Sequence, residues 1–264
     1  MTLRTQPLRL QRRLRVASPV RLAAFFCAAF APLLHAQTTT VFTSSATIAA
    51  TNAAYDGQNI IVSNCSVVID GQHSFANVQA ISNAVLSYAA ATNVNVQGMT
   101  VDGSSALYLC GGLAFNVGGT LVATNNSTVI CQGTNTIAQV SNQWAGVGVT
   151  ITAGNVSLAA GAAISADGQG YASGNGGGAG PGGGEGGAGA GSYGGLGSGP
   201  SGPTYGNAMA PLDLGSAGWV GSQGGGRSSW SCPATSWSMA ASAPTEQAAR
   251  MALRAAQFIS SPEG

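Results

Sequence analysis

Short apolar runs broken by small polar residues dominate the chain from Thr38 to Gly170. Three examples are Ile60-Ile61-Val62, Val94-Asn95-Val96 and Val149-Thr150-Ile151. Alternation with a period of two and enrichment in β-branched residues are typical of β-strands. No window of helical length keeps a 3.6-residue apolar period here. The pattern therefore predicts an all-β fold for this part of the chain.

Turn signals separate these runs. The dipeptide Asp-Gly begins at Asp56, Asp70, Asp102 and Asp167. It is typical of turns because both residue types tolerate positive φ angles. Asparagine shares this tolerance, so we expect further turns at four asparagines. They are Asn64, Asn125, Asn126 and Asn155.

An internal repeat appears when residues 119–133 are aligned with residues 154–168. The alignment places Leu121 with Val156 and Val129 with Ile164, and both copies end in glycine. Such repeats are typical of solenoids, in which each coil buries its apolar face by stacking on the next. We therefore predict a right-handed parallel β-helix (solenoid) fragment. The strand spacing also allows an antiparallel β-sandwich, which remains the alternative.

Residues 171–226 differ in composition, because 24 of these 56 residues are glycine and they follow no three-residue period. A collagen triple helix is therefore excluded. Glycine raises the entropic cost of ordering and leaves few side chains to bury, so we expect a flexible or loosely ordered insertion projecting from one turn. Matches to G-x-G-x-x-G lack the strand, the helix and the basic partner of a nucleotide-binding loop, so no cofactor is predicted.

Charged residues are few and unevenly distributed. The chain of 264 residues contains no lysine, and no arginine lies between Gln37 and Gly226. A segment this poor in cations cannot neutralise phosphates, so nucleic-acid binding is excluded for it. Anionic membrane surfaces are disfavoured for the same reason.

The first 36 residues are typical of an export signal. Six arginines precede an apolar stretch at residues 22–34, and Leu34-His35-Ala36 resembles a cleavage site. The apolar stretch is shorter than the roughly 20 residues that span a bilayer, and Pro32 interrupts it, so a membrane anchor is less favoured. We expect cleavage before Gln37, no integral membrane segment after it, and a secreted or cell-surface protein.

Four cysteines follow the leader: Cys65, Cys110, Cys131 and Cys232. No pair has zinc-ligand spacing and His73 is the only later histidine, so no metal site is predicted. Export permits disulfides. We expect buried small apolar side chains, with Cys110–Cys131 as the one candidate disulfide.

Asp70 and His73 are the two weak candidates for catalysis. Asp70 lies three positions before His73, so His73 could be half of an acid/base pair, but no nucleophile is placed with it. The glycine after Asp70 favours a turn, and a structural role is the favoured interpretation of His73. We therefore predict no catalytic residue and no enzymatic activity.

The composition changes again after Gly226. Residues 245–259 are rich in alanine and could form a helical cap with Thr245 as its N-cap. We favour a frameshift near residue 227. A shifted frame turns Trp-Ser pairs into valine and Met-Ala pairs into glycine, and synonymous codons then permit the Ile-Ser-Ala-Asp-Gly of residues 164–168 to recur. Residues 227–264 would then be out of frame, and the solenoid would be truncated.

Three segments carry a resemblance to a known class of proteins. They are YDGQNIIV at residues 55–62, IDGQHSF at residues 69–75, and ISADGQGY at residues 164–171, which runs into the glycine-rich stretch. They resemble the repeats of large exported bacterial glycine-rich β-repeat proteins, similar in architecture to adhesins and autotransporter passengers. The resemblance covers about residues 40–226 and implies a parallel β-helix at the cell surface. It brings no catalytic motif.

The sequence thus divides into a signal peptide (1–36), a β-repeat solenoid (37–170), a glycine-rich low-complexity loop (171–226) and an out-of-frame tail (227–264). We expect a non-enzymatic exported scaffold or adhesin-like module whose partners are glycans or other cell-surface components. One alternative is a carbohydrate-active β-helix enzyme, a polysaccharide lyase or glycosidase. It would need clustered carboxylates and a basic residue. No lysine or arginine precedes Arg227 in the mature chain. The other alternative is a non-functional truncated gene product.

Overall fold

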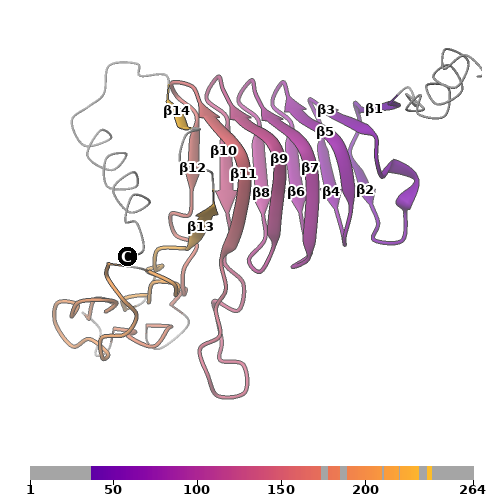
Figure 1. Ribbon diagram of the computed structural model, residues 1–264. Coiled ribbons are helices and arrows are strands. Elements are labelled where there is room, and N and C mark those ends of the chain that lie inside the picture. The colour runs from indigo at the N-terminus through magenta and orange to yellow at the C-terminus, as the bar shows by residue number, and fades with distance from the viewer. Residues whose placement is uncertain are drawn as a thin grey trace, which may run out of the picture. The chain divides into compact units, whose positions relative to one another are not determined.

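The computed structural model describes residues 37–173, 178–184, 189–209, 211–219, 221–231 and 237–239. Their strands form two parallel sheets (Figure 1). Sheet A contains β1 (Thr39–Phe42), β3 (Asn59–Ser63), β5 (Ser74–Ile81), β7 (Asn93–Val101), β9 (Ala114–Ala123), β11 (Val149–Leu158), β13 (Ser228–Ser231) and β14 (Trp237–Met239). Sheet B contains β2 (Ala46–Ile48), β4 (Ser66–Ile69), β6 (Val85–Tyr88), β8 (Ala106–Leu109), β10 (Thr128–Cys131) and β12 (Ala163–Ser165). A single 3-10 turn, η1 (Ala53–Tyr55), lies between β2 and β3 in the described chain.

From β1 to β12 the chain alternates between the two sheets, so each strand pairs with the strand two elements away, always in parallel. This arrangement is the predicted parallel β-solenoid. The alternative of a β-sandwich is wrong, because a sandwich joins antiparallel neighbours within one sheet, whereas consecutive strands here lie in different sheets.

The core consists of inward-facing side chains stacked in register from coil to coil. In sheet B, Leu107 lies between Leu86 and Val129, and all three are fully buried. In sheet A, Met99, Leu121 and Val156 form a similar buried column. Burial of one such side chain stabilises the fold by about 1.5–3 kcal/mol relative to its exposure. The alternation seen in the sequence is this alternation between inward and outward positions.

The predicted repeat is confirmed at both tested positions. Val156 of β11 pairs with Leu121 of β9, and Ile164 of β12 pairs with Val129 of β10. The two copies of the repeat lie far apart in sequence because residues 132–148 are inserted between β10 and β11. Earlier coils lack this insertion, and there Asn93 already pairs with Ala114.

The A-to-B corner, where the chain passes from sheet A to sheet B, uses left-handed residues as expected. Asn64, Asn125 and Asn126 have φ angles of 53°, 49° and 60°. The prediction of a turn at Asn155 is wrong, because this residue follows a bulge and pairs with Thr120 inside β11. Ser105 stabilises the corner from within, since its hydroxyl donates to the Asp102 carbonyl at 2.6 Å and accepts from the Ala84 N–H at 3.0 Å.

The B-to-A corner, where the chain returns to sheet A, gives rise to the long insertions (Figure 1). Residues 132–148 form an arm whose two branches pair antiparallel at Thr134 and Val147. Its tip turns at Ser141 and Asn142, which have φ angles of 51° and 60°. The described part of the glycine-rich segment follows β12 and leaves from the same corner.

That glycine-rich segment is packed where the structure describes it, in place of the loose insertion that its composition indicates. Tyr171 and Leu214 are buried together, with Trp144 of the arm against them. Glycine permits close backbone approach: a Cβ on Gly182 would lie 2.6 Å from the Ser192 carbonyl oxygen, and the Ser192 N–H donates to the Gly182 carbonyl at 2.7 Å. Backbone hydrogen bonds therefore provide the order that side chains cannot.

The segment predicted to be out of frame contributes two strands. Ser228 of β13 pairs with Val149, and Trp237 of β14 pairs with Val156, both on β11. They occupy the position of a further rung on sheet A. The predicted helix at residues 245–259 lies outside the described residues.

Candidate functional site

His73 lies buried at the B-to-A corner between β4 and β5, with 2% of its surface exposed. Its Nδ1 lies 2.9 Å from Asp56 Oδ1, and its Nε2 lies 3.1 Å from the backbone oxygen of Asp70. Its ring stacks on Phe75 with centroids 5.6 Å apart. The structure therefore brings Asp70 and His73 together through the Asp70 backbone, and the carboxylate partner is Asp56.

Each nitrogen of the His73 ring lies within hydrogen-bond distance of an oxygen atom of the protein. Asp56 Oδ1 also accepts from the Ser74 N–H at 3.4 Å. The contacts join the loop after η1 to β5 and occupy both ring nitrogens. A general base needs one free nitrogen toward its substrate. The geometry therefore favours a structural role for His73.

Asp102 stabilises the A-to-B corner of the following coil. Its Oδ1 accepts from the Thr124 hydroxyl at 2.6 Å and from the Asn125 side-chain amide at 2.7 Å. These hydrogen bonds favour the carboxylate and lower the pKa of Asp102. The Asp-Gly pair therefore serves a turn, as its sequence predicts, and its carboxylate has structural partners.

Cys65, Cys110 and Cys131 are free thiols, so the structure does not form the candidate disulfide between Cys110 and Cys131. The strand register pairs Cys131 with Leu109, and Cys110 is the residue that follows Leu109. Burial raises the pKa of both Cys110 and Cys131, the latter to about 12. Thiolates are disfavoured at such sites, which fits small apolar core residues rather than reactive ones.

The described part of the chain contains neither a cluster of metal ligands nor a membrane-spanning helix. No group of three or more His, Cys, Asp or Glu side chains there could hold a metal ion. No helix within the same residues is long and apolar enough to cross a bilayer.

Amide side chains distinguish the two sheets. No described strand contains a charged residue. Every asparagine and glutamine of the described strands belongs to sheet A: Asn59, Asn77, Gln79, Asn93, Asn95, Gln97, Asn116 and Asn155. Sheet B has none. The outward face of sheet A therefore carries amides and hydroxyls without charged side chains, beside apolar residues such as Val41 and Ile61.

Some of these amides form ladders along the solenoid. The Asn77 side-chain amide donates to Asn59 Oδ1 at 2.9 Å, and the Asn59 amide donates to the Thr39 hydroxyl at 3.4 Å. A second ladder joins the Asn116 amide to Asn95 Oδ1 at 3.1 Å. In each bond the donor belongs to the later coil, so the amide dipoles share one direction.

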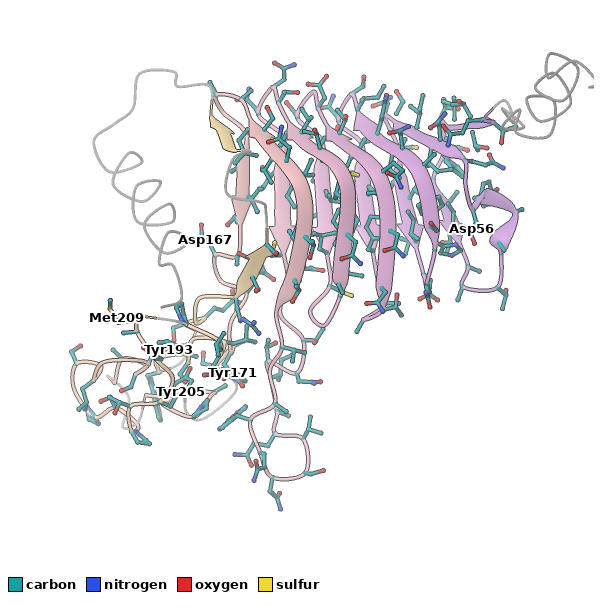
Figure 2. All side chains as sticks on the ribbon, viewed as in Figure 1. Asp56, Asp167, Tyr171, Tyr193, Tyr205 and Met209 are labelled. Atoms are coloured by element: carbon teal, nitrogen blue, oxygen red, sulfur yellow. The ribbon has the colours of Figure 1, made fainter. Side chains whose placement is uncertain are left out.

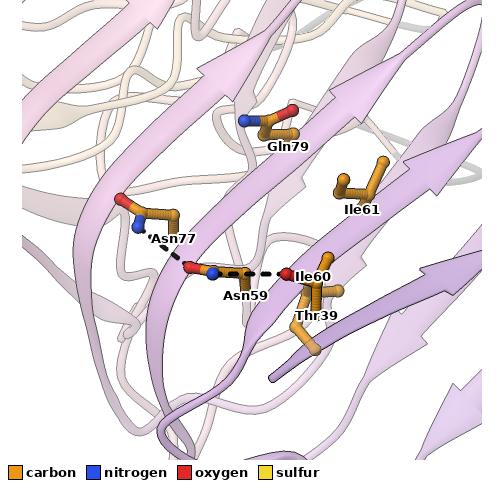
Figure 3. Close-up of a pocket in the computed structure, with 6 residues that line it drawn as sticks. All are labelled: Thr39, Asn59, Ile60, Ile61, Asn77 and Gln79. Atoms are coloured by element: carbon orange, nitrogen blue, oxygen red, sulfur yellow. Dashed lines mark hydrogen bonds between the residues drawn. The ribbon is translucent and has the colours of Figure 1, made fainter. Parts of the chain in front are cut away.

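A shallow hollow of about 190 Å³ lies over the first ladder, on β1, β3 and β5 (Figure 3). It is lined by Thr39, Asn59, Ile60, Ile61, Asn77 and Gln79. Polar groups occupy one outward column, and Val41 and Ile61 pair in the next. The hollow thus combines hydrogen-bonding side chains with a small apolar strip.

Sequence reasoning found neither this face nor the Asp56–His73 pair. The signal for the face was that amides recur in every second strand-like run, which becomes visible once alternate runs are assigned to different sheets. Asp56 contacts His73 across one coil, so local spacing could not reveal it. In comparisons with known proteins, no family model, no curated protein and no solved structure matches this chain.

Proposed function

We propose that this chain is a non-enzymatic exported scaffold, similar in role to an adhesin module, which contacts cell-surface components through the outward face of sheet A. The observation that carries the proposal is the confinement of all strand amides to that sheet. Outward amides are not needed for folding, because sheet B forms the same coils without them. Their confinement to one face is what a binding surface requires.

Three described ionisable groups support a non-enzymatic role. Asp56, His73 and Asp102 are engaged in corner contacts, and the hollow contains no acid or base. A glycosidase needs two carboxyl groups flanking the bond that it cleaves. Export itself rests on the arginine-rich leader and its apolar stretch.

A carbohydrate-active enzyme is the second candidate, favoured by the 2.9 Å contact between His73 and an Asp56 side chain that is 36% exposed. Release of reducing ends or unsaturated sugars from polysaccharides separates the two candidates. The scaffold predicts no release by the chain. Turnover that is lost in both Asp56→Asn and His73→Ala, with folding retained, would overturn the scaffold in favour of the enzyme.

Attachment is the complementary test. Cells that display the chain should adhere to glycan-coated surfaces, and cells that display a variant with the sheet A amides replaced by serine should adhere less. Equal adhesion by both would contradict the role proposed for sheet A.

A further inference from the structure

The hollow on sheet A has unused hydrogen-bonding capacity. The side chain of Gln79 forms no hydrogen bond within the described residues, and Asn77 Oδ1 accepts none there. Both side chains belong to exposed residues of β5. Pairing an amide with a ligand costs little when the amide has no internal partner to lose.

A glycine leaves the end of the ladder uncovered. Gly98 of β7 pairs with Asn77, and a Cβ on Gly98 would lie 2.6 Å from Asn77 Oδ1. The next coil therefore cannot extend the ladder, and the acceptor at its end stays open. Gln97 and Gly118 repeat the arrangement on the next pair of strands, where a Cβ on Gly118 would lie 2.8 Å from Gln97 Oε1. The amides thus lie along the sheet and keep the face flat.

Polar and apolar groups alternate across the hollow. The column Thr39, Asn59 and Asn77 is polar, and the neighbouring column places Val41, Ile61 and Gln79 in register. The columns are two residues apart along each strand, about 7 Å, and successive coils are about 4.8 Å apart. A sugar ring has the matching chemistry, since its hydroxyls bind amides and its C–H face packs on aliphatic side chains.

Charge selects among sugars. No described strand carries an Asp, Glu, Lys, Arg or His side chain, and Arg227 is the one arginine or lysine within the described residues. A uronate or sulfated sugar would lose hydration at the hollow without a counter-charge. Neutral sugars pay no such desolvation cost.

We infer that the hollow formed by Thr39, Asn59, Ile61, Asn77 and Gln79 is a binding site for a neutral polysaccharide chain. The inference rests on the proposed function and names the ligand class of its binding face. The ligand hydroxyls donate to Asn77 Oδ1 and pair with the Gln79 amide, and its apolar face covers Val41 and Ile61.

The test uses the whole chain in affinity electrophoresis against neutral polysaccharides (dextran, mannan and mixed-linkage β-glucan) and anionic ones (polygalacturonate and alginate). At least one neutral polymer should retard the chain, and neither anionic polymer should. Gln79→Ala should weaken the retarding interaction about three- to tenfold, as expected for one or two lost hydrogen bonds. Ser87→Ala, an outward position of β6 in sheet B, is the matched control and should leave binding unchanged.

Two variants that each introduce one carboxylate give a second comparison, which does not depend on removing a hydrogen bond. Val41→Asp places a carboxylate beside the hollow, and Thr47→Asp places one on an exposed position of β2 in sheet B. Val41→Asp should abolish retardation and Thr47→Asp should preserve it, with circular dichroism checking that both fold.

Three outcomes would overturn the inference: retardation by anionic polymers alone, no retardation by any polymer, or equal effects of the sheet A and sheet B variants. Adhesion of displaying cells without neutral-polysaccharide binding would leave the scaffold standing. Release of sugars by the chain would instead refute the scaffold.

Discussion

Sheets A and B share one core but present different outward faces. Both contribute buried apolar side chains to that core. Outward, sheet A carries amide ladders, whereas sheet B pairs Val68 with Ser87, Ser87 with Tyr108 and Tyr108 with Ile130. The same coil therefore accepts either face. The composition of an outward face is thus free to serve binding, while the inward face is fixed by packing.

The largest effect is expected from the part that both sheets share. Leu107→Ala empties the centre of a fully buried column and should lower the free energy of unfolding by about 2–5 kcal/mol. Urea unfolding monitored by circular dichroism measures the loss. Ser87→Ala on the adjacent strand is the control and should change stability by no more than about 0.5 kcal/mol. Equal losses in the two variants would contradict a common core.

The corner between the sheets should contribute less. Ser105→Ala leaves the N–H of Ala84 without its side-chain acceptor, and a buried N–H without a partner costs about 1–3 kcal/mol. Hydrogen exchange at the Ala84 amide should accelerate, and the free energy of unfolding should fall. Ser104→Ala, which changes the exposed neighbour, serves as control for the loss of a hydroxyl, although its φ of 60° adds a small strain. Unchanged exchange at Ala84 would exclude the role given to Ser105.

Only sheet A should respond to disruption of its ladder. In Gly98→Ala the new Cβ displaces the Asn77 side chain and breaks its bond to Asn59, at a cost of about 1 kcal/mol or less. The side-chain amide resonance of Asn77 should shift in nuclear magnetic resonance spectra. Gly225→Ala, where a Cβ would meet nothing within 4 Å, should leave it in place. A ladder that persists in Gly98→Ala would contradict the packing described.

The smallest effect concerns pH. Hydrogen bonds from Thr124 and Asn125 lower the pKa of Asp102 below its ordinary value of 3.8. The folded chain therefore binds this proton less readily than the unfolded chain, so Asp102 stabilises the fold above that value. The contribution disappears as the pH falls through the lowered pKa. Asp102→Asn should flatten the acid limb of a stability profile, and an unaltered limb would contradict the assignment.

The fold was predictable because apolar and polar residues alternate along each strand as inward and outward positions do. Val129 and Ile164 could be aligned from sequence because the coil repeats, and they pair in the structure. Three features could not be found in this way. The partner of His73 comes from another coil, Asn155 has turn propensity but lies in a strand, and the backbone packing of Gly182 leaves no side-chain signal.

Figure 2 shows that outward side chains line the whole solenoid, on both sheets. The central claim therefore depends on which of these side chains a ligand contacts. The most direct measurement is the set of backbone and side-chain amide resonances of the chain, titrated with an oligosaccharide of the neutral polymer that retards it. We expect shifts of the side-chain amides of Gln79, Asn77 and Asn59, with the backbone amides of β6 and β8 unchanged. Shifts confined to sheet B or to the arm at residues 132–148, or none at saturating ligand, would contradict it.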